Sequence, residues 1–366
     1  MNVIFCGGGT AGHVSPALAI AEELKKRRPD TNIAFIGREG GSENEIIRKS
    51  GYKLYEIKIS GLIRRLTFKN FKVLKDAVRA EHKAEDILTR FKADAVIGTG
   101  GYVCLPVLRA ASKLGIFTAI HESNSTLGLS AKLIARRCDY LFLGAKQSSK
   151  RKNAIYVGNP VREEFFKTSK SEARALLRIP NEKFFILSVG GSIGAEALNT
   201  AAMEMMRDFS QKNDGIIHYH STGKRYFELV KASYPALFKK NEGCTVFPYI
   251  DKMSLYLSAA DIVISRCGAM TLSEIAATGT PSILIPSPNV TANHQTKNAV
   301  YFVENGASVL INESELSSSL LTKIVAKLMN DSDRRKKMSE AAERLCTKNS
   351  AERMVKIIEK HAESAQ

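Results

Sequence analysis

Short runs of β-branched residues alternate with amphipathic helical patterns along the chain, and the alternation restarts once. The first series of strand-like runs covers residues 3–6, 33–37, 54–59, 95–98, 117–121 and 140–143. The second series follows Pro180 and covers residues 184–189, 216–220, 245–247, 262–265, 282–285 and 308–311. Strands separated by helices predict parallel sheets with helices on their faces. We therefore expect an α/β fold of two Rossmann-like domains.

The length of the chain agrees with two domains, because 366 residues exceed the size of one ordinary domain. Gly, Asn and Pro cluster at residues 157–161, directly after a strand-like run, which favours a boundary there. We expect an N-terminal domain over residues 1–161 and a C-terminal domain over residues 162–345. The polar, helix-forming segment at 346–366 is expected to pack back on the first domain.

The charge balance is strongly basic, with 54 Lys and Arg against 37 Asp and Glu and a formal net charge of +17. Such a surplus favours partners that carry phosphate or an anionic membrane surface. Nucleic acid is not expected, because the sequence has no basic region joined to heptads, no zinc-finger spacing and no aromatic RNA-binding signature. The six cysteines are scattered without a C-x-x-C pair, which fits a reducing cytoplasm.

No export signal precedes the first strand-like run, and the most apolar stretch, residues 93–108, is shorter than the ~20 apolar residues that span a bilayer. Membrane contact is therefore expected to be peripheral. The segment 62–75 interleaves bulky apolar residues with cations. It is either a core helix with exposed lysines or a surface that rests on anionic lipid.

Each half begins with a strand that runs directly into a glycine-rich turn and a helix, at Gly7–His13 and at Gly190–Ala195. Such a turn lets main-chain N–H groups approach an anion at the positive end of the helix dipole. Neither turn has the spacing of a P-loop, and the first is not a regular G-x-G-x-x-G. Arg38 and Glu39 follow the second strand-like run and leave an NAD(P)-binding alternative open. A merely structural tight turn is the other alternative for either loop alone.

A third turn, Ser265–Glu274, also joins a strand to a helix. Its residues 268–271 would present main-chain N–H groups to a diphosphate. Glu274 lies one helical turn further on, and a carboxylate there can accept two hydrogen bonds from a ribose diol. An exposed helical glutamate is the alternative.

Polar residues follow two further strand-like runs, at Gly100–Tyr102 and at His121–Asn124. Open α/β sheets bind ligands at the carboxyl ends of their strands. Tyr102 and Asn124 are therefore candidates for contact with sugar hydroxyls, although Asn124 could equally cap loop backbone. The residues alone leave the chemistry of His121 and Glu122 open.

His13 stands at the entrance of the first helix, where a neutral imidazole can accept a proton from an acceptor hydroxyl. Capping the helix and binding substrate without catalysis are the alternatives for this residue. Asp331–Asp333 matches the D-x-D pattern by which some glycosyltransferases hold a metal, but it lies between late helices. We interpret it as a helix cap and expect neither a metal nor a cofactor.

Taken together, these motifs resemble the MurG family of bacterial N-acetylglucosaminyltransferases, which convert lipid I to lipid II. The resemblance covers essentially the whole chain. It depends on residues 8–13 leading to 16–19, 100–102, 121–122 with Asn124, 158–162, 190–195 with 198–199, 250–251, 265–274, and 294–295 with Asn298.

This resemblance implies a glycosyltransferase-B fold, in which two Rossmann-like domains with parallel sheets face each other across a cleft. The C-terminal domain would bind UDP-GlcNAc, and the N-terminal domain would meet the lipid-linked acceptor at the cytoplasmic face of the bacterial cell membrane. With His13 as the catalytic residue, the substrate-binding positions implied or suggested by the motifs are Thr10, Ala11, Gly12, Tyr102, Asn124, Arg162, Ser192, Ile250, Ala269, Met270, Thr271, Leu272, Ser273, Glu274, His294, Gln295 and Asn298. The amide of Gln295 can donate to and accept from sugar hydroxyls, which would suit discrimination between epimers.

The sequence departs from the family pattern at four positions. Ala11 replaces a usual Gly, Ser123 a usual Gln, Ser130 a common Asn and His294 a common Gln. The methyl group of Ala11 would limit close approach of the loop to a pyrophosphate or a positive φ. None of the four removes a residue that catalysis requires.

The reaction implied is inverting transfer of GlcNAc from UDP-GlcNAc to the C4 hydroxyl of MurNAc in undecaprenyl-pyrophosphoryl-MurNAc-pentapeptide, lipid I, which yields lipid II for peptidoglycan. Three alternatives remain from the residues: a UDP-GlcNAc epimerase of the same fold, a noncatalytic nucleotide-sugar-binding subunit and an NAD(P)-dependent oxidoreductase. Protein partners and the oligomeric state are not predicted.

Overall fold

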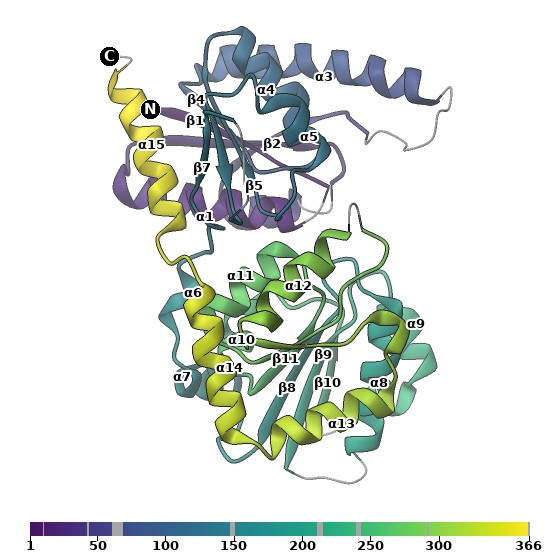
Figure 1. Ribbon diagram of the computed structural model, residues 1–366. Helices are drawn as coiled ribbons and strands as arrows, with labels where there is room; N and C mark the ends of the chain where they lie inside the picture. The colour runs from purple at the N-terminus through teal and green to yellow at the C-terminus, as the bar shows by residue number, and fades with distance from the viewer. Residues whose placement is uncertain are drawn as a thin grey trace. The chain divides into compact units, whose positions relative to one another are not determined.

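The chain forms two compact units, each built on its own sheet (Figure 1). The computed structural model describes residues 1–9, 11–41, 44–60, 69–146, 151–210, 215–238, 243–290 and 293–364. Unit 1 comprises Met1–Arg162 and Thr347–Gln366, and unit 2 comprises Glu163–Cys346. Helices cover both faces of each parallel sheet, so the predicted pair of Rossmann-like α/β domains is confirmed.

The sheet of unit 1 has seven strands in the order β3-β2-β1-β4-β5-β6-β7, all parallel. The strands are β1 Asn2–Cys6, β2 Asn32–Arg38, β3 Lys53–Ile57, β4 Ala95–Gly98, β5 Phe117–Glu122, β6 Tyr140–Leu143 and β7 Ala154–Tyr156. The strand β7 directly precedes the boundary predicted at residues 157–161, but its range was not among the predicted runs; it is only three residues long and exposes Ile155 and Tyr156 at the sheet edge.

Two hydrophobic layers hold the helices of unit 1 to its sheet. The helices are α1 Ala11–Arg27, α2 Asn44–Lys49, α3 Lys69–Phe91, α4 Cys104–Lys113, α5 Leu129–Ile134 and α15 Ser350–Ser364. Alternate residues of a strand point to opposite faces. In β1, Ile4 and Cys6 contribute to the layer under α3, α4 and α5, whereas Val3 and Phe5 contribute to the layer under α1, α2 and α15.

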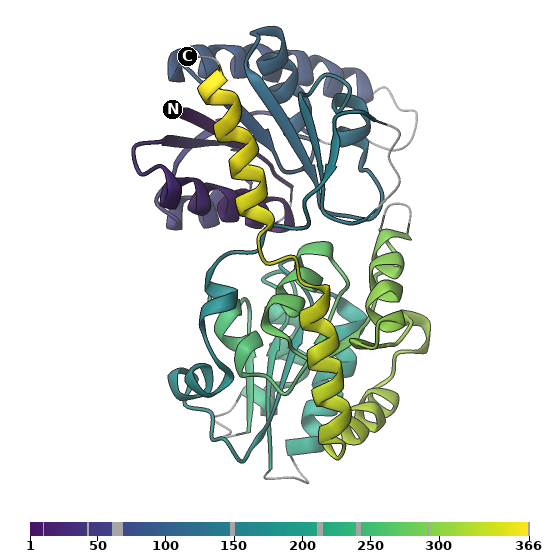
Figure 2. The same cartoon turned by 60° about the vertical axis from the view of Figure 1, so that its left-hand side comes forward.

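The C-terminal helix α15 belongs to unit 1 although it follows unit 2 in sequence (Figure 2). Its residues Met354, Val355 and Ile358 are buried in the same layer as α1. An ion pair of 2.9 Å joins Arg27 of α1 to Glu359. Burial of three apolar side chains contributes more here than the ion pair, which is partly exposed to solvent.

The sheet of unit 2 has six parallel strands in the order β10-β9-β8-β11-β12-β13. They are β8 Phe184–Val189, β9 Ile216–Ser221, β10 Cys244–Phe247, β11 Ile262–Ser265, β12 Ser282–Leu284 and β13 Ser308–Leu310. Each matches a strand-like run of the sequence to within one or two residues, because the central strands are apolar and bounded by turn residues.

The helices of unit 2 lie on both faces of this sheet (Figure 1). They are α6 Glu164–Lys167, α7 Lys170–Leu177, α8 Glu196–Ser210, α9 Phe227–Ser233, α10 Met253–Ala259, α11 Ala269–Thr278, α12 His294–Glu304, α13 Ser318–Met329 and α14 Ser332–Leu345, with short 3-10 turns η1 Pro235–Phe238 and η3 Glu313–Glu315. The side chain of Asp331 accepts the N–H of Arg334 at 2.9 Å, so the predicted helix cap is confirmed. No helix in the described ranges is long and apolar enough to cross a membrane.

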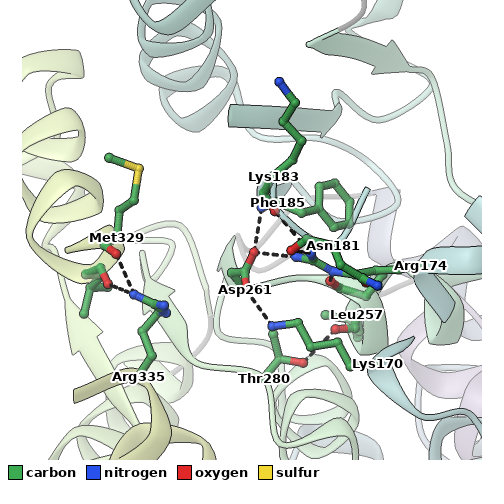
Figure 3. A network of polar contacts seen from close by, with 12 residues as sticks. Lys170, Arg174, Asn181, Lys183, Phe185, Leu257, Asp261, Thr280, Met329 and Arg335 are labelled. Atoms are coloured by element: carbon green, nitrogen blue, oxygen red, sulfur yellow. Dashed lines mark hydrogen bonds and ion pairs between the residues drawn. The ribbon is translucent and has the colours of Figure 1, made fainter. Parts of the chain in front are cut away.

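A buried polar network fixes the amino ends of β8 and β11 (Figure 3). The guanidinium group of Arg174 is almost fully buried and donates to Asp261 and to the main-chain carbonyls of Pro180, Asn181, Lys183 and Ala259. Asp261 also accepts the N–H of Phe185 at 2.7 Å and the ammonium group of Lys170 at 2.6 Å. The network therefore supports the fold at the end of the sheet away from the glycine turns.

The two sheets share one topological feature, a reversal of the strand order near the middle of the sheet. Strand order reverses between β1 and β4 in unit 1, and between β8 and β11 in unit 2. Ligands of open α/β sheets bind outside the carboxyl ends of the strands at such a switch point. The three predicted glycine turns follow β1, β8 and β11, so each unit presents a candidate site at its switch point.

Candidate functional site

Two glycine loops interlock at the switch point of unit 1. Gly101 has φ +82°, and a Cβ added to it would lie 1.9 Å from the carbonyl oxygen of Gly8. Gly100 has φ +113°, and a Cβ there would lie 2.5 Å from Nδ1 of His13. Positive φ and the lack of space both require glycine at these positions. The loop after β4 is therefore seated against the loop after β1.

His13 is the third residue of α1, half-buried, with its ring beside Gly100. The carbonyl oxygen of His13 accepts a hydrogen bond of 2.6 Å from the hydroxyl of Thr99, which is itself buried. Thr99 was not predicted as a site residue. The available signal is a hydroxyl side chain at the end of a strand, directly before two glycines. This bond ties the first turn of α1 to the end of β4.

The start of α1 carries the other predicted residues of this loop. Ala11 and Gly12 are its first two residues, so the backbone at Ala11 is helical. Thr10 lies outside the described residues. The first N–H groups of a helix have no intrahelical acceptor, and they suit an anion.

Two buried side chains shape the loop after β5. The Nε2–H of His121 donates to the carbonyl of Gly158 at 3.3 Å. The pKa of His121 is lowered to about 4, mainly by burial; the bond to Gly158 opposes this shift, and the electrostatic interaction with His13 adds to it. The ring is therefore neutral near pH 7.

Glu122 accepts hydrogen bonds from the main-chain N–H groups of Asn124 and Gly128, at 3.0 and 2.7 Å. It also accepts the side-chain amino group of Asn124 at 3.0 Å. Its carboxylate thus closes the loop of residues 122–128 on itself. The amide oxygen of Asn124 is the atom of that side chain suited to accept from a sugar hydroxyl.

Tyr102 and Arg162 are held within unit 1. The ring of Tyr102 lies 3.3 Å from the position of a Cβ on Gly9, so it packs on the first glycine loop. The Nε–H of Arg162 donates to Glu22 of α1 at 3.0 Å. Arg162 is thereby anchored to the helix that begins at the glycine loop.

In unit 2, helix α11 starts at the predicted anion-facing turn. Its N-cap is Gly268, which has no side chain to cap the first N–H groups. Met270 and Leu272 are buried in the core, so only their main-chain atoms can face a ligand. The side chains of Thr271, Ser273 and Glu274 are half-buried on the remaining face.

Two side chains of α12 hold this turn through the main-chain N–H and C=O groups of Cys267. The Oε1 atom of Gln295 accepts the N–H groups of Cys267 at 3.3 Å and Ser287 at 2.9 Å. The amino group of Asn298 donates to the carbonyl of Cys267 at 3.2 Å. The oxygen of Gln295 therefore serves the protein backbone, and its amino group is the part suited to a sugar hydroxyl. His294, the first residue of α12, is half-buried beside it.

Arg266 supports the same turn and was not predicted. It donates to the carbonyls of Ile285 and Pro286 at 3.2 and 3.3 Å and pairs with Glu313. A cation between a buried strand and Gly268 is the signal that could have identified it. Two anchors, α12 and Arg266, thus fix the start of α11.

The remaining predicted residues of unit 2 lie on two other loops. Ser192 is exposed on the loop after β8, between Gly191 at φ +84° and Gly194 at φ +92°. Ile250 is buried after β10, so its main chain is the part that can contact a ligand.

Two family models match this arrangement. The glycosyltransferase family 28 N-terminal domain matches residues 3–143, and the glycosyltransferase family 28 C-terminal domain matches residues 185–358. The fold, the switch-point turns and these matches define a UDP-sugar glycosyltransferase of family 28.

Comparison with individual proteins identifies the family within this class to which the chain belongs. The chain is 38% identical over 363 residues to the UDP-N-acetylglucosamine--N-acetylmuramyl-(pentapeptide) pyrophosphoryl-undecaprenol N-acetylglucosamine transferase of Acetivibrio thermocellus, covering 98% of this chain and 97% of that relative. The crystal structure of MurG from Acinetobacter baumannii superposes with a TM-score of 0.71 at 28% identity, covering 98% of this chain and 99% of that one. The chain belongs to the MurG family, which confirms the resemblance.

Another solved structure shares the fold alone. The structure of a putative UDP-N-acetylglucosamine 2-epimerase from Listeria monocytogenes has a TM-score of 0.72 at 13% identity, over 99% of this chain and 97% of that one. Fold does not imply function at such identity.

Proposed function

We propose that this enzyme transfers GlcNAc from UDP-GlcNAc to the C4 hydroxyl of MurNAc in lipid I and so forms lipid II for peptidoglycan. The observation that carries the proposal is its similarity along almost the full chain to transferases named for this reaction. The anion-facing turns in both units agree with two substrates that each carry a diphosphate.

We assign the donor to unit 2. The N–H groups at the start of α11 suit the diphosphate, Glu274 suits the ribose hydroxyls and the amino group of Gln295 suits the sugar. Ser192 and the main chain of Ile250 complete the donor contacts. The acceptor then falls to unit 1, at the loops that carry His13 and Tyr102.

The reaction is a single in-line displacement. The C4 hydroxyl oxygen forms the new bond to the anomeric carbon, the bond from that carbon to UDP breaks, and the electron pair leaves with UDP. His13 accepts the hydroxyl proton, and configuration changes from α to β. The start of α11 stabilises the charge that grows on the departing UDP.

We place the enzyme on the cytoplasmic face of the cell membrane as a peripheral protein, because its acceptor is a lipid. Residues 62–68 of the predicted basic segment 62–75 lie outside the described residues. A second candidate surface lies on α5 and the turn that follows it, where Leu129 and Leu133 are exposed together with Lys132, Arg136 and Arg137. Leucines among cations suit anionic lipid.

Vesicle sedimentation tests this surface. Changing both Leu129 and Leu133 to Asp should lower binding to anionic vesicles roughly tenfold or more, since each buried leucine contributes ~1.5 kcal/mol or more. Leu176→Asp is the matched control, because Leu176 is equally exposed on α7. Equal binding by the two variants would contradict the assignment of this surface.

The function is tested by the initial rate of UDP release from UDP-GlcNAc, with and without a lipid I analogue. Release should depend on the acceptor. His13→Ala should lower kcat by ~100-fold or more while the Kd for UDP-GlcNAc stays unchanged. His82→Ala, at an exposed position of α3, is the control. Conversion of UDP-GlcNAc to an epimer without acceptor and without UDP release would instead indicate an epimerase.

A further inference from the structure

A chain of polar side chains lies inside the core of unit 2, just below the glycine loop after β8. Ser188 of β8 stands between His218 and His220 of β9, and Asn199 of α8 follows His220. All four side chains are at most 2% exposed. The hydroxyl of Ser188 lies 2.7 Å from Nε2 of His218 and 2.7 Å from Nδ1 of His220. The proposed mechanism uses none of these groups.

The end of this chain at Asn199, beside the glycine loop, fixes the direction of its hydrogen bonds. The carbonyl of Thr222 can only accept, so the amino group of Asn199 donates to it at 3.0 Å. The oxygen of Asn199 then faces Nε2 of His220 at 3.1 Å, and this nitrogen must carry a hydrogen. Each assignment follows from the previous one.

The neutral state of the histidines determines the remaining bonds. Burial lowers the pKa of His220 to about 4 and lowers that of His218 well below its ordinary value. Nδ1 of His220 is therefore a bare acceptor for the Ser188 hydroxyl, and the Ser188 oxygen accepts from Nε2–H of His218. The chain ends at Nδ1 of His218, which has no hydrogen-bond partner among the described residues. A bare nitrogen at that end agrees with the direction of the other bonds.

The near end of the chain touches both ends of the glycine loop. A Cβ on Gly190 would lie 3.2 Å from Oδ1 of Asn199. A Cβ on Gly194, at φ +92°, would lie 2.2 Å from the carbonyl oxygen of Thr222, which Asn199 anchors. The loop is thus seated on the side chain of Asn199 and on the carbonyl that it holds.

We propose that His220 and Asn199 are positioning residues for the sugar-nucleotide donor. The one-directional chain orients the amide of Asn199, and this amide sets the loop that presents Ser192 and main-chain N–H groups to UDP-GlcNAc. The inference rests on the proposed function, because that function supplies the donor. Neither residue contacts the reacting atoms.

Two substitutions of His220 separate positioning from general support of the core. In His220→Gln, the side-chain amide places an amino group near the position of Nε2 and so keeps the hydrogen bond to the oxygen of Asn199. Asn keeps a polar group near Nδ1 but is too short to reach Asn199. We expect His220→Asn to raise the KM for UDP-GlcNAc about tenfold, the usual effect of one lost buried hydrogen bond, and His220→Gln to raise it less than about threefold. The KM for the lipid I analogue should change less than about threefold in both.

Calorimetric titration with UDP-GlcNAc and ¹⁵N spectra of labelled histidines complete the test. Both His218 and His220 should appear as neutral rings with the hydrogen on Nε2, assigned from the signals lost in His220→Gln. An Nδ1–H form of His220, equal donor KM in both variants, or equal rises for both substrates would overturn the inference. Failure of the wild type to bind UDP-GlcNAc would refute the donor assignment itself, whatever the histidine spectra show.

Discussion

Replacing Gly101 by Ala should separate the two interlocked loops of unit 1. The new Cβ would lie 1.9 Å from the carbonyl oxygen of Gly8, a main-chain atom that cannot rotate away. Ordinary contact begins near 3.4 Å, so the loops must move apart by about 1.5 Å. Gly8 is three residues before the start of α1, and the displacement therefore reaches the helix that carries His13.

The loss of stability expected for Gly101→Ala has two parts. An L-residue at φ +82° costs ~1–2 kcal/mol, and forced overpacking adds ~1–3 kcal/mol. Gly51→Ala isolates the first part, because Gly51 has φ +78° and no heavy atom within 4 Å of the added Cβ. We expect the free energy of unfolding to fall ~1–2 kcal/mol for Gly51→Ala and ~2–5 kcal/mol for Gly101→Ala.

Urea unfolding followed by circular dichroism measures the difference in stability, and UDP release with a lipid I analogue measures activity. Misplacement of a catalytic group by about 1 Å costs ~100-fold in rate, so kcat/KM should fall by that order in Gly101→Ala and stay near wild type in Gly51→Ala. The reasoning is refuted if the two variants lose the same stability and keep the same activity.

Three further predictions address other parts of the molecule. Gln295→Glu keeps the oxygen that accepts from Cys267 and Ser287 but loses the amino group. The KM for UDP-GlcNAc should therefore rise about tenfold, while the free energy of unfolding stays unchanged. Gln295→Leu, which removes the oxygen as well, is the comparison, and an equal loss of stability in the two variants would contradict the prediction. Arg174→Met leaves Asp261 buried without its guanidinium partner and should lower the free energy of unfolding by ~3–5 kcal/mol in urea titrations, whereas a loss under ~1 kcal/mol would show that the network is dispensable. The folded-state pKa of His220 lies near 4, below the ordinary 6.5, so the unfolded chain takes up the proton first and stability should fall as pH drops from 6.5 to 4, by up to roughly 3 kcal/mol. His220→Gln should make the fall measured between pH 7 and pH 5 shallower, and an unchanged pH dependence would contradict the assignment.

The strands were largely predictable because most are apolar runs bounded by turn residues. β7 was not, since a three-residue edge strand with two exposed side chains has little hydrophobic pattern. The glycine turns were also evident in the sequence. Their interlocking was not, because it depends on β1 and β4 being neighbours, which the alternation of helices and strands does not specify.

Roles that depend on tertiary contact were the hardest to predict. The oxygen of Gln295 accepts from Cys267 and Ser287, which belong to two different loops, so its use by the backbone cannot be predicted from the sequence. His218 and His220 do show a signal, as polar residues at alternate positions of an apolar strand. Their meaning emerges only when the sheet places Ser188 opposite His220 and within hydrogen-bond distance of both rings.

The structure of the product tests the account most directly. Wild-type enzyme is incubated with UDP-GlcNAc and a lipid I analogue, and the product is analysed by mass spectrometry and NMR. We predict one added GlcNAc, joined by a β linkage to C4 of MurNAc, as a single displacement from the α-linked donor requires. An α linkage, attachment at another hydroxyl, or formation of an epimer of UDP-GlcNAc without acceptor would contradict the account.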